Sequence, residues 1–184
     1  MGLLSLEHSR AAYAADFVLY GAAVLALSIT LLAVPAARTP AVAALVLAGV
    51  AGWTLLEYVL HRFVLHGLQP FKGWHDAHHA RPTALICAPT LLSAGLIAGG
   101  VFAPAWWLGT PWQASALTLG VLAGYLAYAT THHAVHHWHR GGSWLLARKR
   151  WHARHHSPRP GQAPCYGVTS GLWDHAFGST GRWH

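Results

Sequence analysis

Four long runs of apolar residues constrain this chain of 184 residues more than any other feature. They cover residues 17–34, 41–60, 86–108 and 112–131, and Glu57 is their one charged residue. A helix needs about 20 apolar residues to cross the hydrocarbon core of a bilayer. A buried helix of a soluble protein is the alternative for a single run, but four in succession favour the membrane. The runs therefore predict an all-α integral membrane protein, with residues 1–184 forming one membrane domain of about four transmembrane helices.

The composition argues against a soluble domain, a nucleic-acid-binding protein and a protein built on cysteine chemistry. The chain is 54% hydrophobic and 9% charged, which is unlike a soluble domain. Its net charge of +7 is spread among apolar runs, so we expect no nucleic-acid binding. Cys87 and Cys165 are too few and too distant for a disulfide framework or a cysteine metal site. We expect no cleavable signal peptide, because the first apolar run follows Glu7, Arg10 and Asp16.

The basic residues predict the orientation in the membrane. Four spans would place the N-terminus, residues 61–82 and residues 132–180 on one side. Of the twelve Lys and Arg, only Arg38 falls on the other side. Basic residues concentrate on the cytoplasmic side of membrane proteins. We therefore expect a cytoplasmic N-terminus and a cytoplasmic helical cap, built from 61–82 and 132–180.

Histidines gather in that predicted cap. Apart from His8, His175 and His184, the sixteen histidines fall into two clusters. The upstream cluster is His61, His66, His75, His78 and His79, and the downstream cluster is His132, His133, His136, His137, His139, His152, His155 and His156. Neutral imidazoles suit iron, zinc and copper. The two clusters predict one polynuclear metal site, whereas His8, His139, His175 and His184 read as ordinary interfacial residues.

The spacings within the clusters predict which imidazoles act together. Positions i, i+3 and i+4 share one face of a helix. Two trios have this spacing, so each could aim three nitrogens at a common region: His75, His78 and His79, and His152, His155 and His156. Together with His61, His66, His132 and His136 they make ten candidate ligands, enough for two metal ions with about five nitrogens each.

Two spacings leave the assignment open. The pairs His132/His136 and His133/His137 both have i, i+4 spacing but point about 100° apart, so only one pair is expected to bind metal fully. His61 and His66 would project about 140° apart on an ideal helix. They either serve different metals or lie where the helix unwinds.

Several charged residues lie near these histidines. Glu57 and Asp76 either orient imidazoles or are ordinary interfacial charges, and Asp174 is expected to hold the C-terminal tail together. The run 148–150, Arg-Lys-Arg, is a candidate contact for an acidic partner or anionic lipid. Anchoring by the positive-inside rule explains the same run and is the interpretation that we favour from the sequence.

These motifs resemble the fatty acid hydroxylase and sterol desaturase superfamily of membrane di-iron enzymes. The matching motifs are His61-x4-His66, His75-x2-His78-His79, His132-x3-His136-His137 after Tyr128, and His152-x2-His155-His156. The tail from Tyr166 to Gly178, Tyr-Gly-Val-Thr-Ser-x-x-Trp-Asp-x-x-Phe-Gly, is similar to the closing signature of the fatty acyl 2-hydroxylase branch. Carotenoid hydroxylases share the histidine motifs but lack this tail.

The resemblance implies a chemistry. Two iron ions, replaceable by zinc in purified protein, would use O2 to hydroxylate a membrane lipid through C–H abstraction and hydroxyl rebound. The substrate would be a fatty acyl chain, a sphingolipid or a sterol-like molecule. Electrons would come from a separate reductase or carrier protein, because the chain shows no dinucleotide motif or cysteine cluster. The sequence leaves the oligomeric state open.

Other functions fit parts of the pattern. A carotenoid hydroxylase or a lipid desaturase of the same superfamily would use the same histidines. A zinc or copper transporter or buffer would bind metal without oxidation, although a transporter should place its ligands near the bilayer midplane rather than at helix ends. A bis-histidine haem carrier would leave the two trios unexplained.

Overall fold

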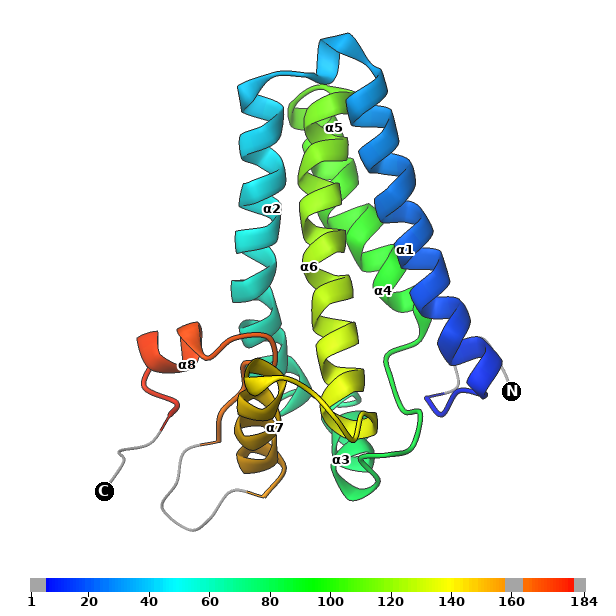
Figure 1. Cartoon of the computed structure of the whole chain (residues 1–184). Coiled ribbons are helices and arrows are strands. Elements are labelled where there is room, and N and C mark those ends of the chain that lie inside the picture. Colours follow the sequence, from blue (N-terminus) through cyan, green and yellow to red (C-terminus); the bar gives the residue numbers. More distant parts are fainter. Residues whose placement is uncertain (1–5, 158–163, 181–184) are drawn as a thin grey trace. The chain divides into compact units, whose positions relative to one another are not determined.

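The computed structural model describes residues 6–157 and 164–180, and most of these residues are helical (Figure 1). The longest helices are α1 (Arg10–Ala33), α2 (Pro40–Val59) and α6 (Pro111–His137). The π-helical segment η3 (Ala98–Phe102) joins α4 (Thr90–Ile97) to α5 (Ala103–Leu108). The shorter elements are η1 (Pro35–Ala37), η2 (Leu60–Leu65), α3 (Phe71–Ala80), α7 (Ser143–His156) and α8 (Leu172–Ala176). Within the described residues there is no strand beyond one isolated bridge between Glu7 and Ile86.

Four helical stretches are long and apolar enough to cross a membrane, which confirms the predicted all-α membrane fold. They are Arg10–Ala33, Pro40–Leu65, Thr90–Leu108 and Pro111–His137. Large apolar side chains on them remain exposed, including Leu25, Leu47 and Trp107. A soluble protein rarely exposes so much apolar surface, whereas a bilayer covers it.

The ends of the spans differ from the sequence prediction. The first helix begins at Arg10 rather than near 17, because the Ser9 hydroxyl accepts a hydrogen bond from the Ala12 amide and caps it. Residues 10–16 therefore belong to the first helix, while residues 1–5 lie outside the described part. The third span begins at Thr90 instead of 86, since residues 85–87 pair with residues 6–8 through backbone hydrogen bonds.

The third and fourth spans differ in continuity. The third span is interrupted at Gly99 and Gly100 by η3, where the helix widens to π geometry between α4 and α5. The fourth span continues without interruption through His137, so the downstream histidine motif lies on the last turns of α6.

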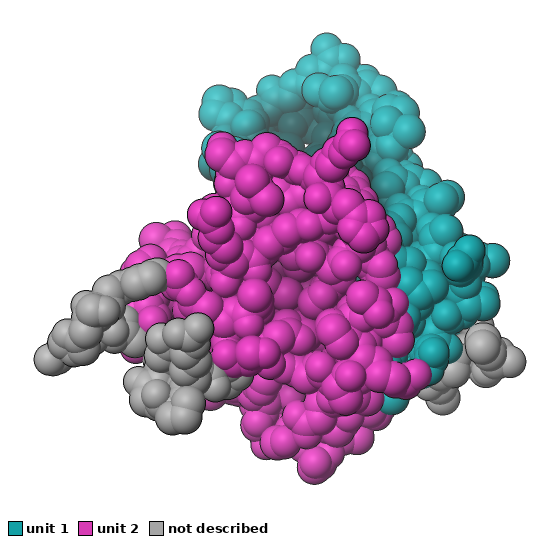
Figure 2. Space-filling view, turned by 60° about the horizontal axis from the view of Figure 1, so that its bottom comes forward, with its two compact units in different colours: residues 1–53, 85–126 teal, residues 54–84, 127–184 magenta. Residues whose placement is uncertain are grey.

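The chain divides into two units, coloured separately in Figure 2. Unit 1 comprises Met1–Trp53 and Leu85–Leu126. Within it, α2 and α6 approach closely at Gly49 and Gly120, where a Cβ on Gly120 would clash with the carbonyl oxygen of Val46. Small residues allow such backbone contact between helices in membranes. A buried cluster extends this packing: Leu31, Ala37, Val42, Ala116 and Leu119.

Unit 2 comprises Thr54–Ala84 and Ala127–His184. Its described elements are the last turns of α2 and α6 together with η2, α3, α7 and α8. All twelve histidines predicted as ligands or register alternatives belong to this unit.

Candidate metal centre

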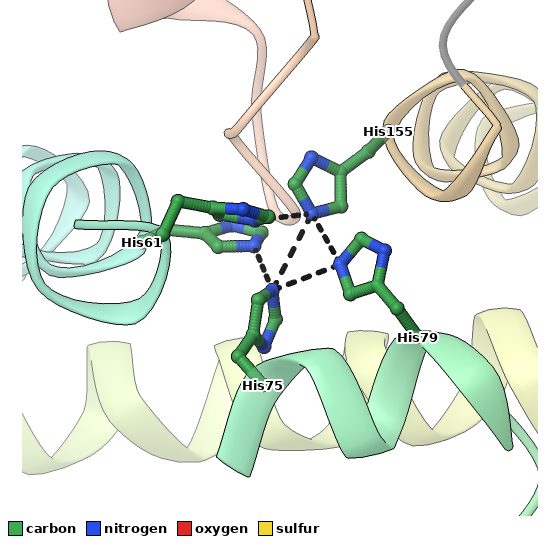
Figure 3. A group of neighbouring side chains, drawn as sticks. His61, His75, His79 and His155 are labelled. Carbon is green, nitrogen blue, oxygen red and sulfur yellow. Dashed lines mark hydrogen bonds between the residues drawn. The ribbon is translucent and has the colours of Figure 1, made fainter. Parts of the chain in front are cut away.

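Nine histidines of unit 2 form two groups whose ring nitrogens face one another. Group one contains His61, His66, His75, His79 and His155, and group two contains His78, His136, His152 and His156. Within each group, one nitrogen per residue lies within 4.8 Å of the others. Figure 3 shows four members of group one pointing their rings toward a common point.

The spacing of the nitrogens fits a shared metal ion. In group one, His75 Nε2 lies 2.9 Å from His61 Nε2 and 3.0 Å from His79 Nε2. In group two, His152 Nε2 lies 2.8 Å from His136 Nε2 and 3.0 Å from His156 Nε2. Imidazole nitrogens bind zinc at about 2.0–2.1 Å, so two ligands on one ion are about 2.9 Å apart at a right angle and about 3.3 Å at the tetrahedral angle. The observed distances are those expected between two ligands of one ion.

The local backbone explains why His61 and His66 belong to one group. Both lie at η2, where the chain leaves α2 in π-helical geometry. A π turn closes between residues i and i+5, so residues five apart project in closer directions than they would on an α-helix. Their ring centroids are 5.3 Å apart. The helix therefore widens at this point, as one of the two interpretations of the five-residue spacing expected, and both imidazoles belong to group one.

Each predicted trio is divided between the two groups. On α3, His75 and His79 belong to group one but His78 belongs to group two; on α7, His152 and His156 belong to group two but His155 belongs to group one. The expectation that each trio serves one common region is therefore wrong in this respect. Residues at i and i+4 diverge by about 40°, whereas the residue between them at i+3 points about 60–100° away.

The downstream pairs on α6 also separate. His136 is a member of group two, and the His132 ring lies 4.8 Å from the rings of both His78 and His136. His133 and His137 instead stack on each other, with ring centroids 4.5 Å apart, and neither belongs to a group. The pair His132/His136 thus faces the clustered nitrogens and the pair His133/His137 does not.

The members of the two groups that lie outside the spans have a lowered pKa, which favours the neutral form. Burial, followed by repulsion from neighbouring imidazoles, lowers the pKa of His78 and of His156 to about 3. The pKa of His66 is lowered to about 4, first by burial. The same causes lower the pKa of His75 and His155. A neutral imidazole offers a lone pair to a metal, so the arrangement is ready to bind cations at neutral pH.

Several buried nitrogens lack a hydrogen-bond partner among the described residues. Neither ring nitrogen of His78 has one, although this side chain is 4% exposed. An unpaired buried polar atom is costly and rare in a folded protein. A metal ion would satisfy one of the two nitrogens of His78, which supports the fit of group two to such an ion.

Asp174 connects the C-terminal tail to α7, the helix that bears His152, His155 and His156. This fully buried carboxylate accepts hydrogen bonds from the amides of Tyr166 and Gly167 at 2.8 Å and from the Ser179 hydroxyl at 2.7 Å. The indole of Trp151 on α7 also donates to it, at 3.3 Å. The expectation that Asp174 holds the tail together is confirmed.

Glu57 has a role that the sequence left open. Its Oε1 accepts from the amides of Val168 and Thr169 at 2.7 and 3.0 Å, and its Oε2 accepts from the Thr169 hydroxyl at 2.6 Å. It therefore holds the tail rather than contacting an imidazole. Asp76, by contrast, forms a surface ion pair of 2.6 Å with Lys72, which contributes little to stability.

The tail also supplies a contact that sequence reasoning missed. The backbone carbonyl of Tyr166 lies 2.5 Å from His61 Nδ1. A backbone carbonyl leaves no residue-type signal, so only the Tyr-Gly-Val-Thr motif itself could have marked this position.

A small cavity of about 170 Å³ opens beside group two. Its walls include His136, His152 and His156 together with Lys149 and Val135. The Lys149 ammonium donates to the carbonyl of Trp138, and Arg148 packs its guanidinium over the Trp151 ring. The use of this basic run as a docking surface stays a prediction.

These features define a helical membrane protein with two adjacent polyhistidine groups. Comparison with known protein families shows which family this is. The model of the family named Fatty acid hydroxylase matches residues 46–179. The chain belongs to the fatty acid hydroxylase family, as the motifs predicted.

Similar proteins agree with this family. Dihydroceramide fatty acyl 2-hydroxylase FAH2 of Arabidopsis thaliana is 36% identical over 155 residues, covering 76% of this chain and 62% of that protein. Fatty acid 2-hydroxylase of Homo sapiens is 31% identical over 140 residues, covering 68% and 36%. A solved structure of full-length scs7p, in which only the hydroxylase domain is visible, gives a TM-score of 0.77 at 26% identity, covering 92% of this chain and 66% of that chain. The chain thus spans less than two thirds of the length of these relatives.

Proposed function

We propose that this protein is an O2-dependent hydroxylase of a fatty acyl chain in a membrane lipid, acting at the carbon next to the carbonyl. The observation that carries the proposal is the pair of histidine groups in a chain of the fatty acid hydroxylase family. The position of hydroxylation follows the relatives, which are named fatty acyl or fatty acid 2-hydroxylases. The reaction would be RH + O2 + 2e− + 2H+ → ROH + H2O.

We assign ten histidines to two iron ions. The first ion would be held by group one and the second by group two, completed by His132, whose ring lies 5.0 Å from that of His152. Each ion would then have five imidazoles. Bound iron would supply the oxidation of an unactivated C–H bond by O2, and the protein would position the acyl chain and exclude competing reactions. Zinc would compete for the same imidazoles in purified protein.

The cavity beside group two suggests where the substrate reacts. Three of the proposed ligands line it, so a carbon placed there would lie next to the second ion. Lys149, also in its wall, would donate to the carbonyl end of the acyl chain through an N–H that its bond to the Trp138 carbonyl does not use. The carbon at the 2-position is bonded directly to the carbonyl carbon. A small cavity is therefore enough to hold both the carbonyl end and the reacting carbon beside the second ion.

We place the histidine groups and the N-terminus on the cytoplasmic side. Eleven of the twelve basic residues fall on that side, all except Arg38. The chain would act as a single membrane domain and receive electrons from a separate reductase or carrier. The basic run 148–150 is the proposed contact for an acidic carrier.

Lipid analysis of a host that expresses this chain tests the proposal. Cells grown aerobically with iron should accumulate 2-hydroxy acyl lipids, and growth under 18O2 should place one labelled oxygen atom in the new hydroxyl. A His155→Ala variant should abolish the product, because His155 Nε2 lies 3.0 Å from His79 Nε2 and 3.1 Å from His66 Nε2. His139→Ala is the matched control, since His139 is exposed and outside both groups.

The same experiment separates the alternatives. A desaturase would yield lipids that have lost two hydrogens without gaining oxygen, and a carotenoid hydroxylase would modify a carotenoid only. A metal transporter or buffer would change the metal content of the cells and leave the lipids unaltered. Identical lipid profiles for the wild type and His155→Ala would refute the hydroxylase proposal.

A further inference from the structure

Two buried carboxylates hold the segment that hydrogen-bonds to His61. We propose that Glu57 and Asp174 are positioning residues, which act through the Tyr166 carbonyl to fix the tautomer and direction of the His61 imidazole. The inference rests on the proposed role of His61 as a metal ligand. It concerns the assembly of group one and is independent of the substrate.

The contact between His61 and Tyr166 determines the tautomer. A backbone carbonyl only accepts hydrogen bonds, so His61 Nδ1 must carry the proton across the 2.5 Å contact. His61 Nε2 then keeps its lone pair, and it is this atom that lies 2.9 Å from His75 Nε2 within group one. A hydrogen bond at the nitrogen away from the metal is the usual way in which proteins orient a histidine ligand.

The Tyr166 carbonyl depends on side chains for its direction, because residues 164–170 form neither helix nor strand. Asp174 binds the amides of Tyr166 and Gly167, and Glu57 binds the amides of Val168 and Thr169. Four consecutive amides are therefore held by two carboxylates. Figure 3 shows the segment leading toward α8 reaching the rings of group one.

The positions of the two carboxylates favour an orienting role. Glu57 precedes His61 by four residues on a continuous helical backbone, so both side chains project from one face. Glu57, which holds the segment, and His61, which the segment contacts, therefore lie on the same continuous helical stretch. Asp174 has a second connection, through Trp151, to the helix that bears His155. Both carboxylates are buried, with Glu57 4% exposed and Asp174 0% exposed, so water competes little for their hydrogen bonds.

The role can be tested by counting zinc ions bound to the purified full-length protein during titration with competing chelators. We expect two ions in the wild type. In Glu57→Ala, one ion should bind about 10- to 100-fold more weakly, as when the orienting partner of a histidine ligand is removed, and the other should be unaffected. Glu57→Gln should largely rescue binding. Its amide oxygen can still accept from the two backbone amides, while the Thr169 hydroxyl can turn to accept from the new NH2.

A spectroscopic measurement separates orientation from general stability. With 15N-labelled histidine, the His61 resonances of the wild type should report a protonated Nδ1, in metal-free as well as zinc-bound protein. In Glu57→Ala this tautomer should lose its dominance. Asp76→Asn is the control, because Asp76 is an exposed carboxylate beside His75 that bonds only Lys72 in the described residues. If Glu57→Ala fails to fold, Thr169→Val removes just the hydroxyl bond to Glu57 and should show a smaller change in the same direction.

The outcomes are distinct. Wild-type affinity for both ions and an unchanged His61 tautomer in Glu57→Ala would overturn the inference, and so would equal weakening of both ions. The tautomer of metal-free protein tests the positioning even where zinc binding is weak. A protein that passes these tests but makes no hydroxylated lipid would refute the proposed function and leave the positioning role standing.

Discussion

The choice between two histidine pairs on α6 gives the sharpest prediction. His136→Ala should abolish tight binding at one of two metal ions, whereas His137→Ala should leave both ions bound. The two residues are neighbours on the same helix, so the substitutions are matched in chemistry and position. They differ in direction: His136 Nε2 lies 2.8 Å from His152 Nε2, while the His137 ring stacks on His133.

The expected magnitude follows from the composition of group two. His136 is one of four imidazoles whose nitrogens converge there, or one of five with His132. Removing an outer partner of a ligand costs about 10- to 100-fold in metal affinity, so removing the ligand itself should cost at least about 100-fold. At about 1.4 kcal/mol for each tenfold change, the loss is at least about 2.8 kcal/mol of binding free energy. For His137→Ala we expect a change of less than about twofold, because no nitrogen of group two is removed.

Competition with a chromophoric chelator measures both affinities on purified protein, and elemental analysis counts the ions. Circular dichroism at the same protein concentration checks that each variant keeps its helical content. Tight binding of two ions by His136→Ala, together with loss of an ion from His137→Ala, would refute the reasoning. It would mean that α6 presents the opposite face to the metals.

Four further predictions follow from single features. Prolonged treatment with an iron chelator should abolish hydroxylation, and ferrous iron should restore it where zinc does not, because zinc has no redox chemistry. The metal-free protein should lose thermal stability as the pH falls from about 6.5 toward 3. The unfolded imidazoles take up protons over that range, whereas His78 and His156, with a pKa of about 3, do not; a melting temperature independent of pH would contradict this. Gly167→Ala should destabilise the fold by about 1–3 kcal/mol in denaturant unfolding, since its Cβ would clash with the Ser170 carbonyl. Gly120→Ala should cost a similar amount by forcing α2 and α6 apart, and an unaltered unfolding midpoint would show that the helices can separate freely.

The membrane architecture was predictable because it depends on composition over long windows. Each span needs about 20 apolar residues, and small errors at the ends do not change the number of spans. The ends themselves were harder to predict. The start of α1 at Arg10 depends on one hydrogen bond from the Ala12 amide to the Ser9 hydroxyl, and the late start of α4 depends on pairing between residues far apart in the chain. Neither effect changes the apolar pattern.

The candidate site was predictable as a set of residues but not as two groups. Helical spacing showed that His75, His78 and His79 lie near one another. It did not show that His78 would belong to a different group from the other two. That division depends on where η2 and α6 place their own imidazoles. The π-helical turn that brings His61 and His66 into one group was also not predictable, because the expected angle between them was taken from an ideal α-helix.

The same reasoning explains why the motifs have their particular form. A helix that serves only one ion would need only an i, i+4 pair. The third histidine, at i+3, points about 60–100° away and can serve a second ion on a neighbouring site. α3 and α7 divide their three histidines in opposite ways. The i, i+4 pair of α3 belongs to group one and its third histidine to group two, whereas the pair of α7 belongs to group two and its third histidine to group one. With His61 and His66, group one has five imidazoles, and His132, the neighbour of His136, would bring the proposed ligands of the second ion to five. The His-x2-His-His spacing, present once on each of these helices, therefore fits the two ions proposed above, whereas a single ion in group one would leave His78 without a metal and a single ion in group two would leave His155 without one.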